Sequence, residues 1–253
     1  GGERMQDNRE AKVKVINLTK KFDDLLVLDD ISFEVKKGEF LCIVGPTGCG
    51  KTTFLNSITK LYKPTSGEIL VNNEPVDLDK HNVAYIFQEY STMPWLTVEE
   101  NVRFGLDIKH VERAKANKLV DEYLDIVGLT KFRKYYPEQL SASMLQRVVI
   151  ARAFATQPEL LLMDEPYGQL DIELRFKLED ELLNLWQRTG TTVIFITHNI
   201  EEAVYLGERI LVLTNKPTKI KEEIMNDLPR PRDIASLDFV KLRNEVTDLI
   251  KWW

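Results

Sequence analysis

With 253 residues, 43% of them hydrophobic and 29% charged, the chain is long enough to bury one sizeable core and too apolar to be intrinsically disordered. Its formal net charge of −6, without a concentrated basic face, argues against nucleic acid as a partner. The apolar runs are too short to span a bilayer or to form a signal peptide, and the two cysteines, Cys42 and Cys49, are too few for a disulfide framework or a metal site, so the composition fits a reducing, cytoplasmic setting.

Strand patterns fill the first part of the chain. Residues 1–12 are interpreted as an N-terminal tail, of which residues 1–4 precede the first methionine and are read as a cloning remnant. Short, partly alternating runs predict strands at residues 13–18 and 31–35, and the continuous apolar run of residues 40–44 is typical of a buried strand.

A helix is predicted next, at residues 51–61. Its apolar face holds Phe54, Leu55, Ile58 and Leu61. Residues 69–71, followed by the Asn72-Asn73 turn, predict a hairpin, and residues 83–87 predict a further strand.

The middle of the chain is predicted to be helical. Thr97 and Glu100 have the spacing of a capping box, which marks a helix start. A second helix is predicted to stop at Gly128. Its apolar stripe consists of Leu119, Val120, Tyr123, Leu124 and Val127. A third helix is predicted at residues 141–156.

Strands and helices alternate in the last third. Residues 160–163 and 192–197 predict buried strands, and residues 171–188 predict a helix closed by Gly190. An amphipathic helix is predicted near the C-terminal end of the sequence. Its apolar stripe consists of Phe239, Leu242, Val246, Leu249, Ile250 and Trp253.

The order of these elements predicts an α/β fold. Strands are followed by helices and then by strand–helix alternation, which is typical of an α/β core with a helical insertion. We therefore expect one domain at residues 13–235, interrupted by a helical insertion at about residues 90–156, with the amphipathic helix at residues 236–253 following it.

Residues 45–53 read GPTGCGKTT and have the spacing of a phosphate-binding P-loop. An apolar strand precedes them and an amphipathic helix follows, which is the context that this motif requires. Glycines let the backbone curl so that its N–H groups point at a phosphate, and the helix N-terminus adds positive potential. The alternative is a glycine-rich turn that happens to precede a helix, and the context on both sides argues against it.

Single residues of this P-loop have expected roles in binding ATP. Lys51 is expected to reach the β- and γ-phosphates of ATP, and the Thr52 hydroxyl to ligate Mg²⁺. Cys49 is interpreted as a small space-filling residue. The ATP-binding loop is predicted to comprise Gly45, Pro46, Thr47, Gly48, Cys49, Gly50, Lys51, Thr52 and Thr53.

Two carboxylates, Asp164 and Glu165, end the apolar strand of residues 160–163. In open α/β sheets, ligands bind beyond the carboxyl ends of the strands. Asp164 is therefore expected to hold Mg²⁺ through a water molecule, and Glu165 to orient and deprotonate an attacking water. The alternative is that these residues are only an acidic pair at a helix start before Pro166. The presence of the P-loop favours the catalytic interpretation over this alternative.

Three further positions complete a known pattern. Gln88 ends a strand, Ser141 opens a helix, and His198 ends another strand. Together with the P-loop and the acidic pair, and in this order, they make residues 13–235 resemble the nucleotide-binding domains of ABC transporters. The resemblance implies a P-loop NTPase core with an N-terminal antiparallel β subdomain and an inserted α-helical subdomain.

The resemblance also implies roles for single residues. Phe22 is expected to stack on adenine, and the alternative is a surface aromatic beside a turn. Gln88 is expected to sense Mg²⁺ and the γ-phosphate, and His198 to contact the γ-phosphate. Asp171 is expected in a loop that crosses a dimer interface, and it has the residue type of an N-cap. The implied catalytic residues are Glu165, His198, Gln88 and Lys51, and the implied Mg²⁺ residues are Thr52, Gln88 and Asp164.

One segment departs from the family pattern. ABC ATPases normally carry Leu-Ser-Gly-Gly at the head of a helix that contacts the γ-phosphate held by the other subunit. This chain has instead the string Leu140, Ser141, Ala142, Ser143 and Met144. We refer to residues 141–144 as the signature segment, and the resemblance implies that it acts on the partner's ATP.

Two interpretations of this departure remain open, because Ala142 and Ser143 add bulk where close backbone approach is expected. One is tolerance, with the Ser143 hydroxyl as a substitute contact. The other is a weak half-site, which slows hydrolysis or favours pairing with a different ATPase chain.

The resemblance implies the ATPase subunit of an ABC importer, peripheral to the cytoplasmic face of the membrane. ATP would lie between two such chains, as a homodimer or heterodimer, and the work would pass to integral membrane permease subunits, which a solute-binding protein serves. Four stretches, residues 87–106, 163–171, 197–213 and 228–233, resemble ATPases that import nitrate, sulfonates and taurine, which favours a small anion as cargo. An importer of another solute, such as a vitamin precursor, and a soluble ABC ATPase outside transport remain alternatives.

A docking patch for the membrane subunits is expected between residues 88 and 100. It would contain Tyr90, Met93, Pro94 and Trp95. The alternative is an apolar loop that caps the helical insertion.

Overall fold

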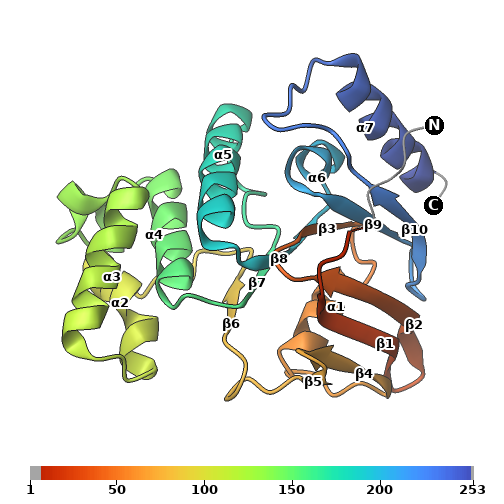
Figure 1. The fold of residues 1–253 in the computed structure, drawn as a ribbon, viewed down its shortest axis with the longest axis horizontal. Helices are drawn as coiled ribbons and strands as arrows, with labels where there is room; N and C mark the ends of the chain where they lie inside the picture. The colour runs from red at the N-terminus through yellow and green to blue at the C-terminus, as the bar shows by residue number, and fades with distance from the viewer. Residues whose placement is uncertain (1–6, 252–253) are drawn as a thin grey trace.

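The computed structural model describes residues 7–251, so residues 1–4, the predicted cloning remnant, and Trp253 of the predicted terminal stripe lie outside the described residues. Two sheets with helices around them make up the fold (Figure 1). One sheet has the strand order β2-β1-β4-β5, and the other has the order β10-β9-β3-β8-β7-β6. The predicted fold class, an α/β P-loop core with an antiparallel N-terminal sheet and a helical insertion, is confirmed.

The four-stranded sheet is antiparallel throughout. Its strands are β1 (Ala11–Phe22), β2 (Leu25–Lys36), β4 (Ser66–Val71) and β5 (Glu74–Pro75). β1 and β2 are longer than predicted, because β1 pairs with β2 on one side and β4 on the other, and this pairing satisfies backbone groups beyond the apolar runs. The predicted hairpin is present: Asn72 and Asn73, with φ of 53° and 62°, turn the chain from β4 into β5.

The four central strands of the six-stranded sheet, β9, β3, β8 and β7, are buried on both faces. Its parallel strands are β3 (Phe40–Val44), β6 (Val83–Ile86), β7 (Leu160–Asp164), β8 (Thr192–Thr197) and β9 (Arg209–Leu213), and β10 (Ile220–Met225) is an antiparallel edge. Leu41 and Ile43 point into a core shared with the antiparallel sheet, whereas Phe40, Cys42 and Val44 point into a core shared with the helices. The continuous apolar run of β3 is explained by these two cores.

Four helices accompany the strands, α1 (Lys51–Ile58), α5 (Ile172–Thr189), α6 (Ile200–Leu206) and α7 (Leu237–Ile250). The prediction that α1 extends to Leu61 and buries that side chain is wrong, since Leu61 is 68% exposed. Lys60 has a φ of 59°, and this left-handed residue turns the chain out of the helix before Leu61 can join the apolar face.

The ends of α5 agree with the sequence signals. Asp171 is the N-cap, and its Oδ1 accepts a hydrogen bond from the Leu174 backbone N–H at 2.9 Å. Gly190 closes the helix with a left-handed φ of 65°. These local contacts hold the loop that leads from β7 into α5.

The helical insertion stands beside the β6 edge of the large sheet (Figure 1). Its helices are α2 (Val98–Ile108), α3 (Arg113–Ile126) and α4 (Ala142–Ala155), with short 3₁₀ turns at Thr130–Phe132 and Pro137–Gln139. The predicted capping box starts α2, because the Glu100 backbone donates to the Thr97 hydroxyl at 3.3 Å and the Thr97 backbone donates to the Glu100 carboxylate at 3.1 Å.

The terminal helix packs on the body of the protein. Phe239 and Val246 of α7 are fully buried, next to α6 and β9. Within residues 7–251, no helix is both long and apolar enough to cross a lipid bilayer.

Candidate active site

The predicted site residues meet at one edge of the six-stranded sheet. The P-loop follows β3, Asp164 ends β7, and His198 and Gln88 follow β8 and β6. β3, β8, β7 and β6 are consecutive neighbours and run parallel, so their carboxyl ends open onto the same edge.

The P-loop backbone depends on glycine at two positions. A Cβ at Gly45 would lie 2.8 Å from the Cys49 sulfur, and Gly50, the N-cap of α1, has a φ of 94° and a side chain there would meet Val27 at 3.0 Å. Cys49 is only 1% exposed and fills the space beneath the loop, and this burial raises the pKa of its thiol. The loop can therefore keep its curve only with small residues at these places.

Lys51 folds back over the loop. Its Nζ donates to the carbonyl oxygens of Gly45 at 2.8 Å and Pro46 at 3.3 Å, and the side chain is buried. Thr47 and Gly48, at the tip of the loop, are exposed to solvent. A phosphate can thus reach the loop, where it would compete with two carbonyl groups for the ammonium.

Asp164 is a largely buried carboxylate. Its Oδ2 accepts hydrogen bonds from Thr52 Oγ1 at 3.3 Å and from the Tyr85 hydroxyl at 3.5 Å. Burial and the neighbouring Glu165 raise the pKa of Asp164, and the Thr52 hydroxyl opposes this effect. A carboxylate beside a hydroxyl supplies the hard oxygen ligands that Mg²⁺ prefers, so Thr52 and Asp164 fit the expected metal.

Tyr85 is a site residue that the sequence analysis missed. It lies on β6, and the pairing of β6 with β7 brings its hydroxyl to Asp164. Phe87, two residues further along the chain, packs against the Tyr85 ring, and the two ring centroids lie 4.5 Å apart. The only signal in the sequence was the aromatic content of the strand that precedes Gln88.

Glu165 and His198 form a direct pair. The His198 Nδ1 lies 2.7 Å from Glu165 Oε1, and the His198 side chain is 56% exposed. Glu165 has a φ of 45°, which is strained for a residue with a side chain, and its N–H donates to the Ile196 carbonyl at 2.8 Å. The strained turn directs the carboxylate from the end of β7 towards the end of β8, and such strain is characteristic of functional sites.

Gln88 and Phe22 lie at the margins of the site. Gln88 is exposed just beyond β6, and its side chain contacts no described residue through a hydrogen bond or ion pair. Phe22 ends β1 and is 36% exposed; its ring meets Tyr62 edge-to-face at 5.1 Å, and Lys20 Nζ lies 4.9 Å from its centroid. Tyr62, distant in the sequence, therefore packs edge-on against the ring that is predicted to stack on adenine.

The signature segment uses its serines within the chain. Ser141 is the N-cap of α4, and its Oγ accepts from the Met144 N–H at 3.3 Å. The buried Ser143 Oγ accepts from Arg147 Nη1 at 3.0 Å, and Arg147 also binds both carboxylate oxygens of Glu181 on α5, at 2.8 and 3.0 Å. Ala142 is exposed, and no hydrogen bond or ion pair of the described residues joins this segment to the P-loop.

An apolar surface lies between β6 and the insertion. A cavity of about 310 Å³ opens there, and Phe87, which lines it, is 53% exposed; Trp95, in the segment that follows, is 72% exposed. Arg152 of α4 donates to the Ser91 carbonyl at 2.8 Å and so holds the segment after Gln88 against the insertion. The residues that line the cavity include Tyr85, Phe87, Met93, Phe104, Val149 and Arg152.

Similar proteins point to one family. The family model described as ABC transporter matches residues 28–168. The chain is 43% identical over 250 residues to an ABC transporter ATP-binding protein of Methanocaldococcus jannaschii, covering 97% of this chain and 94% of that protein. It is 44% identical over 220 residues to the aliphatic sulfonates import ATP-binding protein SsuB of Bacillus cereus, covering 87% of this chain and 86% of SsuB.

A solved structure gives the same result. The ATP-binding cassette MJ0796, a dimer in a post-hydrolysis state bound to ADP and Pi, matches this chain with a TM-score of 0.74 and 34% identity, covering 86% of this chain and all of that one. The family match includes both the P-loop and the acidic pair that ends β7. The chain therefore belongs to the ABC transporter family of ATP-binding proteins and is an ATPase.

Proposed function

We propose that this ATPase, with Mg²⁺ and a second ATPase chain, powers the import of a small anion such as nitrate, a sulfonate or taurine through separate membrane subunits. The observation that carries the proposal is the Glu165–His198 pair, 2.7 Å apart, beside the P-loop. It combines a general base, an imidazole partner and a phosphate-binding loop at one edge of a sheet.

The side chains divide the work of hydrolysis. Loop residues 45–53 bind the phosphates through backbone N–H groups, and Lys51 exchanges its two carbonyl partners for phosphate oxygens. Glu165 accepts the proton of the attacking water, while His198 orients that carboxylate and contacts the γ-phosphate. Phe22 stacks on adenine, and Tyr62 packs edge-to-face against the Phe22 ring.

Three oxygen ligands are available for the metal. Thr52 would bind Mg²⁺ directly, Asp164 through a water molecule, and Gln88 from the end of β6. The ion, when bound, neutralises charge on the phosphate oxygens. Asp164 and Thr52 already lie 3.3 Å apart, so both are positioned for one ligand set.

The signature segment serves the ATP of the second chain. Its backbone N–H groups lie at the N-terminus of α4, where the helix presents positive potential to a phosphate. Residues 141–144 make no polar contact with their own P-loop, which suits action on a partner. Asp171, which caps α5 directly after the β7 loop, is placed by this proposal at the interface between the two chains.

The membrane subunits dock on the apolar surface beside β6. Phe87 and Trp95 are exposed there, and the same segment carries Gln88, so a permease segment seated on it would contact the nucleotide site indirectly. The chain would then lie peripherally at the cytoplasmic face, and a solute-binding protein would deliver the cargo. The 44% identity to SsuB supports a sulfonate-like anion as that cargo.

The variant Glu165→Gln tests the proposal. Without the base, hydrolysis should fall by about 10²- to 10⁴-fold, while ATP still binds, so the variant should accumulate as a dimer at saturating ATP. ATPase assays and light scattering with and without Mg-ATP measure the two effects.

The control is Lys51→Ala, which should lose ATP retention and the dimer together. A Glu165→Gln chain that stays monomeric at saturating ATP would contradict the two-chain arrangement. An ATP affinity that does not change in Lys51→Ala would contradict the P-loop assignment.

A further inference from the structure

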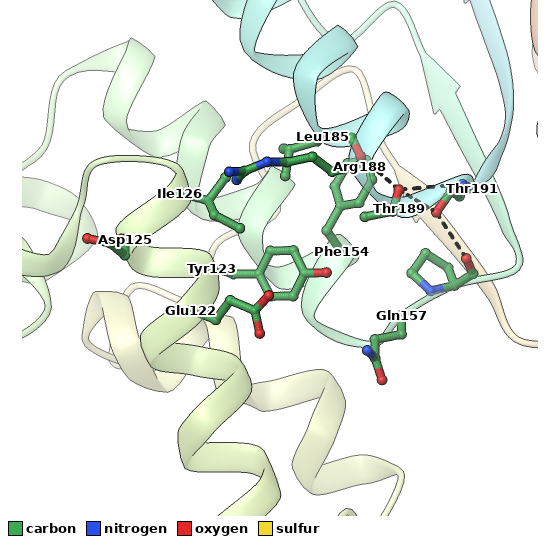
Figure 2. A pocket seen from close by; sticks show the side chains of 11 residues that line it. Glu122, Tyr123, Asp125, Ile126, Phe154, Gln157, Leu185, Arg188, Thr189 and Thr191 are labelled. Atoms are coloured by element: carbon green, nitrogen blue, oxygen red, sulfur yellow. Dashed lines mark hydrogen bonds between the residues drawn. The ribbon is translucent and has the colours of Figure 1, made fainter.

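A cavity of about 650 Å³ lies away from the ATP site, between the helical insertion and the core. Figure 2 shows it between α3 and the C-terminal end of α5, with the connection from α4 to β7 closing one side. Its volume is in the range of small-molecule sites. The lining residues that matter below are Glu122, Tyr123, Phe154, Arg188, Thr189 and Thr191.

Tyr123 presents an unused polar group to this cavity. The side chain is 95% buried, its exposed fraction being 5%, yet its hydroxyl points into the cavity and forms no hydrogen bond with any residue between 7 and 251 (Figure 2). Burial and the nearby Glu122 raise the pKa of Tyr123, so the phenol stays neutral and able to donate. Although the ring is buried, the hydroxyl oxygen is accessible from the cavity, so a ligand that accepts its hydrogen bond would replace water there.

Two opposite charges at the cavity are also unpaired. Glu122 comes from α3 and Arg188 from α5, and neither forms an ion pair or side-chain hydrogen bond with another described residue. The two threonine hydroxyls there are occupied: Thr191 donates to the Pro158 carbonyl, and Thr189 donates to the Leu185 carbonyl. The Asp125 carboxylate and the Gln157 amide also line the cavity without a side-chain partner among the described residues, so its free polar groups are two carboxylates, a guanidinium, a phenol and an amide.

We propose that this cavity binds a small zwitterion, whose ammonium contacts Glu122 and whose carboxylate or sulfonate contacts Arg188. Arg188 offers a planar fork of donors that matches such an anionic group. The C-terminal end of α3, the helix that carries Glu122, adds partial negative charge that favours an ammonium. The Tyr123 hydroxyl donates to the anionic group, and the rings of Tyr123 and Phe154 supply apolar contact.

The position of the site separates it from ATP binding. α3 belongs to the insertion and α5 to the core, so one bound molecule would contact both parts of the chain. None of the residues of the ATP site lines this cavity. The proposal is independent of the cargo and of the two-chain mechanism, and a failure of either leaves it in place.

Calorimetric titration of the whole chain tests the proposal, with glycine, β-alanine and taurine as probes of different charge spacing. At least one should bind saturably with one site per chain, and acetate and ethylamine, which carry only one of the charges, should bind at least about tenfold more weakly. Comparable binding of acetate or ethylamine, or no saturable binding of any probe up to on the order of 10 mM, would overturn it.

Variants locate the binding. Glu122→Gln and Arg188→Gln should each weaken binding of the best probe by about tenfold or more, and Tyr123→Phe by about three- to tenfold. The matched control Lys177→Gln, an exposed charge on α5 away from the cavity, should leave it unchanged. ATP affinity should be the same in all four variants; probe binding that survives in both charge variants would place the ligand elsewhere and overturn the assignment.

Discussion

Two pairs of carboxylates occupy very different surroundings in this molecule. Asp164 and Glu165 end β7 at the open edge of the sheet, where Thr52 and His198 contact them. Glu179 of α5 and Glu202 of α6 are 0% and 4% exposed. Among the described residues, neither side-chain oxygen of Glu179 has a hydrogen-bond partner.

Burial decides the protonation of Glu179 in the second pair. It raises the pKa of Glu179 to about 10, and the neighbouring Glu202 adds to the shift. Arg175 opposes this only in part, with its Nε 3.4 Å from Glu179 Oε1, and the buried Tyr167 nearby brings no positive charge. Glu179 therefore keeps its proton at neutral pH.

The difference teaches that partners and solvent access, not residue type, decide what a carboxylate does. At the end of β7, the Thr52 hydroxyl from α1 and the His198 imidazole from the end of β8 approach the carboxylates and leave room for a substrate. Between α5 and α6, the same type of side chain is enclosed, and Glu179 keeps its proton and has a structural role. The first pair should control turnover, and the second should control stability.

Of the three changes that test this comparison, Asp164→Asn should have the largest effect. Asp164→Asn keeps the size of the side chain but removes the charge that would hold Mg²⁺, so turnover should fall by about 10²- to 10³-fold with little change in stability. Steady-state ATPase rates at saturating Mg-ATP measure it. The control is Asp238→Asn on the surface of α7, and turnover in Asp164→Asn equal to that of this control would break the comparison.

An intermediate effect, on stability, is expected at Glu179. Between about pH 4.5 and pH 10 the folded chain keeps the Glu179 proton that the unfolded chain releases. The free energy of unfolding should therefore fall as pH rises across this window, by at most about 1.4 kcal/mol per pH unit from this residue. Glu179→Gln removes the titrating group, so its stability should depend less on pH and should exceed that of the original chain at alkaline pH.

Urea denaturation at several pH values between about 5.5 and 8.5 measures this difference. Glu173→Gln, which removes an exposed carboxylate from the first turn of the same helix, should keep the original pH dependence. An unchanged slope in Glu179→Gln would mean that Glu179 is ionised in the folded chain, and the contrast between the two pairs would disappear.

The smallest effect is expected at the signature segment, where the partner of the Ser143 hydroxyl likewise decides what that group does. Ser143 already accepts a hydrogen bond from Arg147, so its hydroxyl contributes to the packing of α4 on α5. The double change Ala142→Gly with Ser143→Gly should alter turnover by no more than about twofold, because the backbone donors at the helix start remain. Single-chain ATPase rates measure it, with Ser143→Ala as the control for the hydroxyl alone. A clear increase in the double variant would instead support the weak half-site.

Much of the site could be predicted from the sequence because its signals are local. The P-loop needs adjacent glycines, a lysine and a threonine between a strand and a helix, and all of them lie within residues 45–53. The acidic pair follows one apolar run, and the capping box of Thr97 and Glu100 spans four consecutive residues. Such patterns depend on backbone geometry over one turn or one strand end, which neighbouring residues set.

The remaining features arise from contacts between segments distant in the chain, and only the tertiary structure decided them. Strand pairing brought Tyr85 to Asp164, and the packing of α5 on α6 enclosed Glu179 with Glu202. Leu61 is exposed and not on the predicted buried face, because the left-handed residue Lys60 precedes it. The sequence by itself determined the residue types and local geometry that grip a phosphate. Burial and the partner of each charge emerged only from packing, because they depend on which distant surfaces meet.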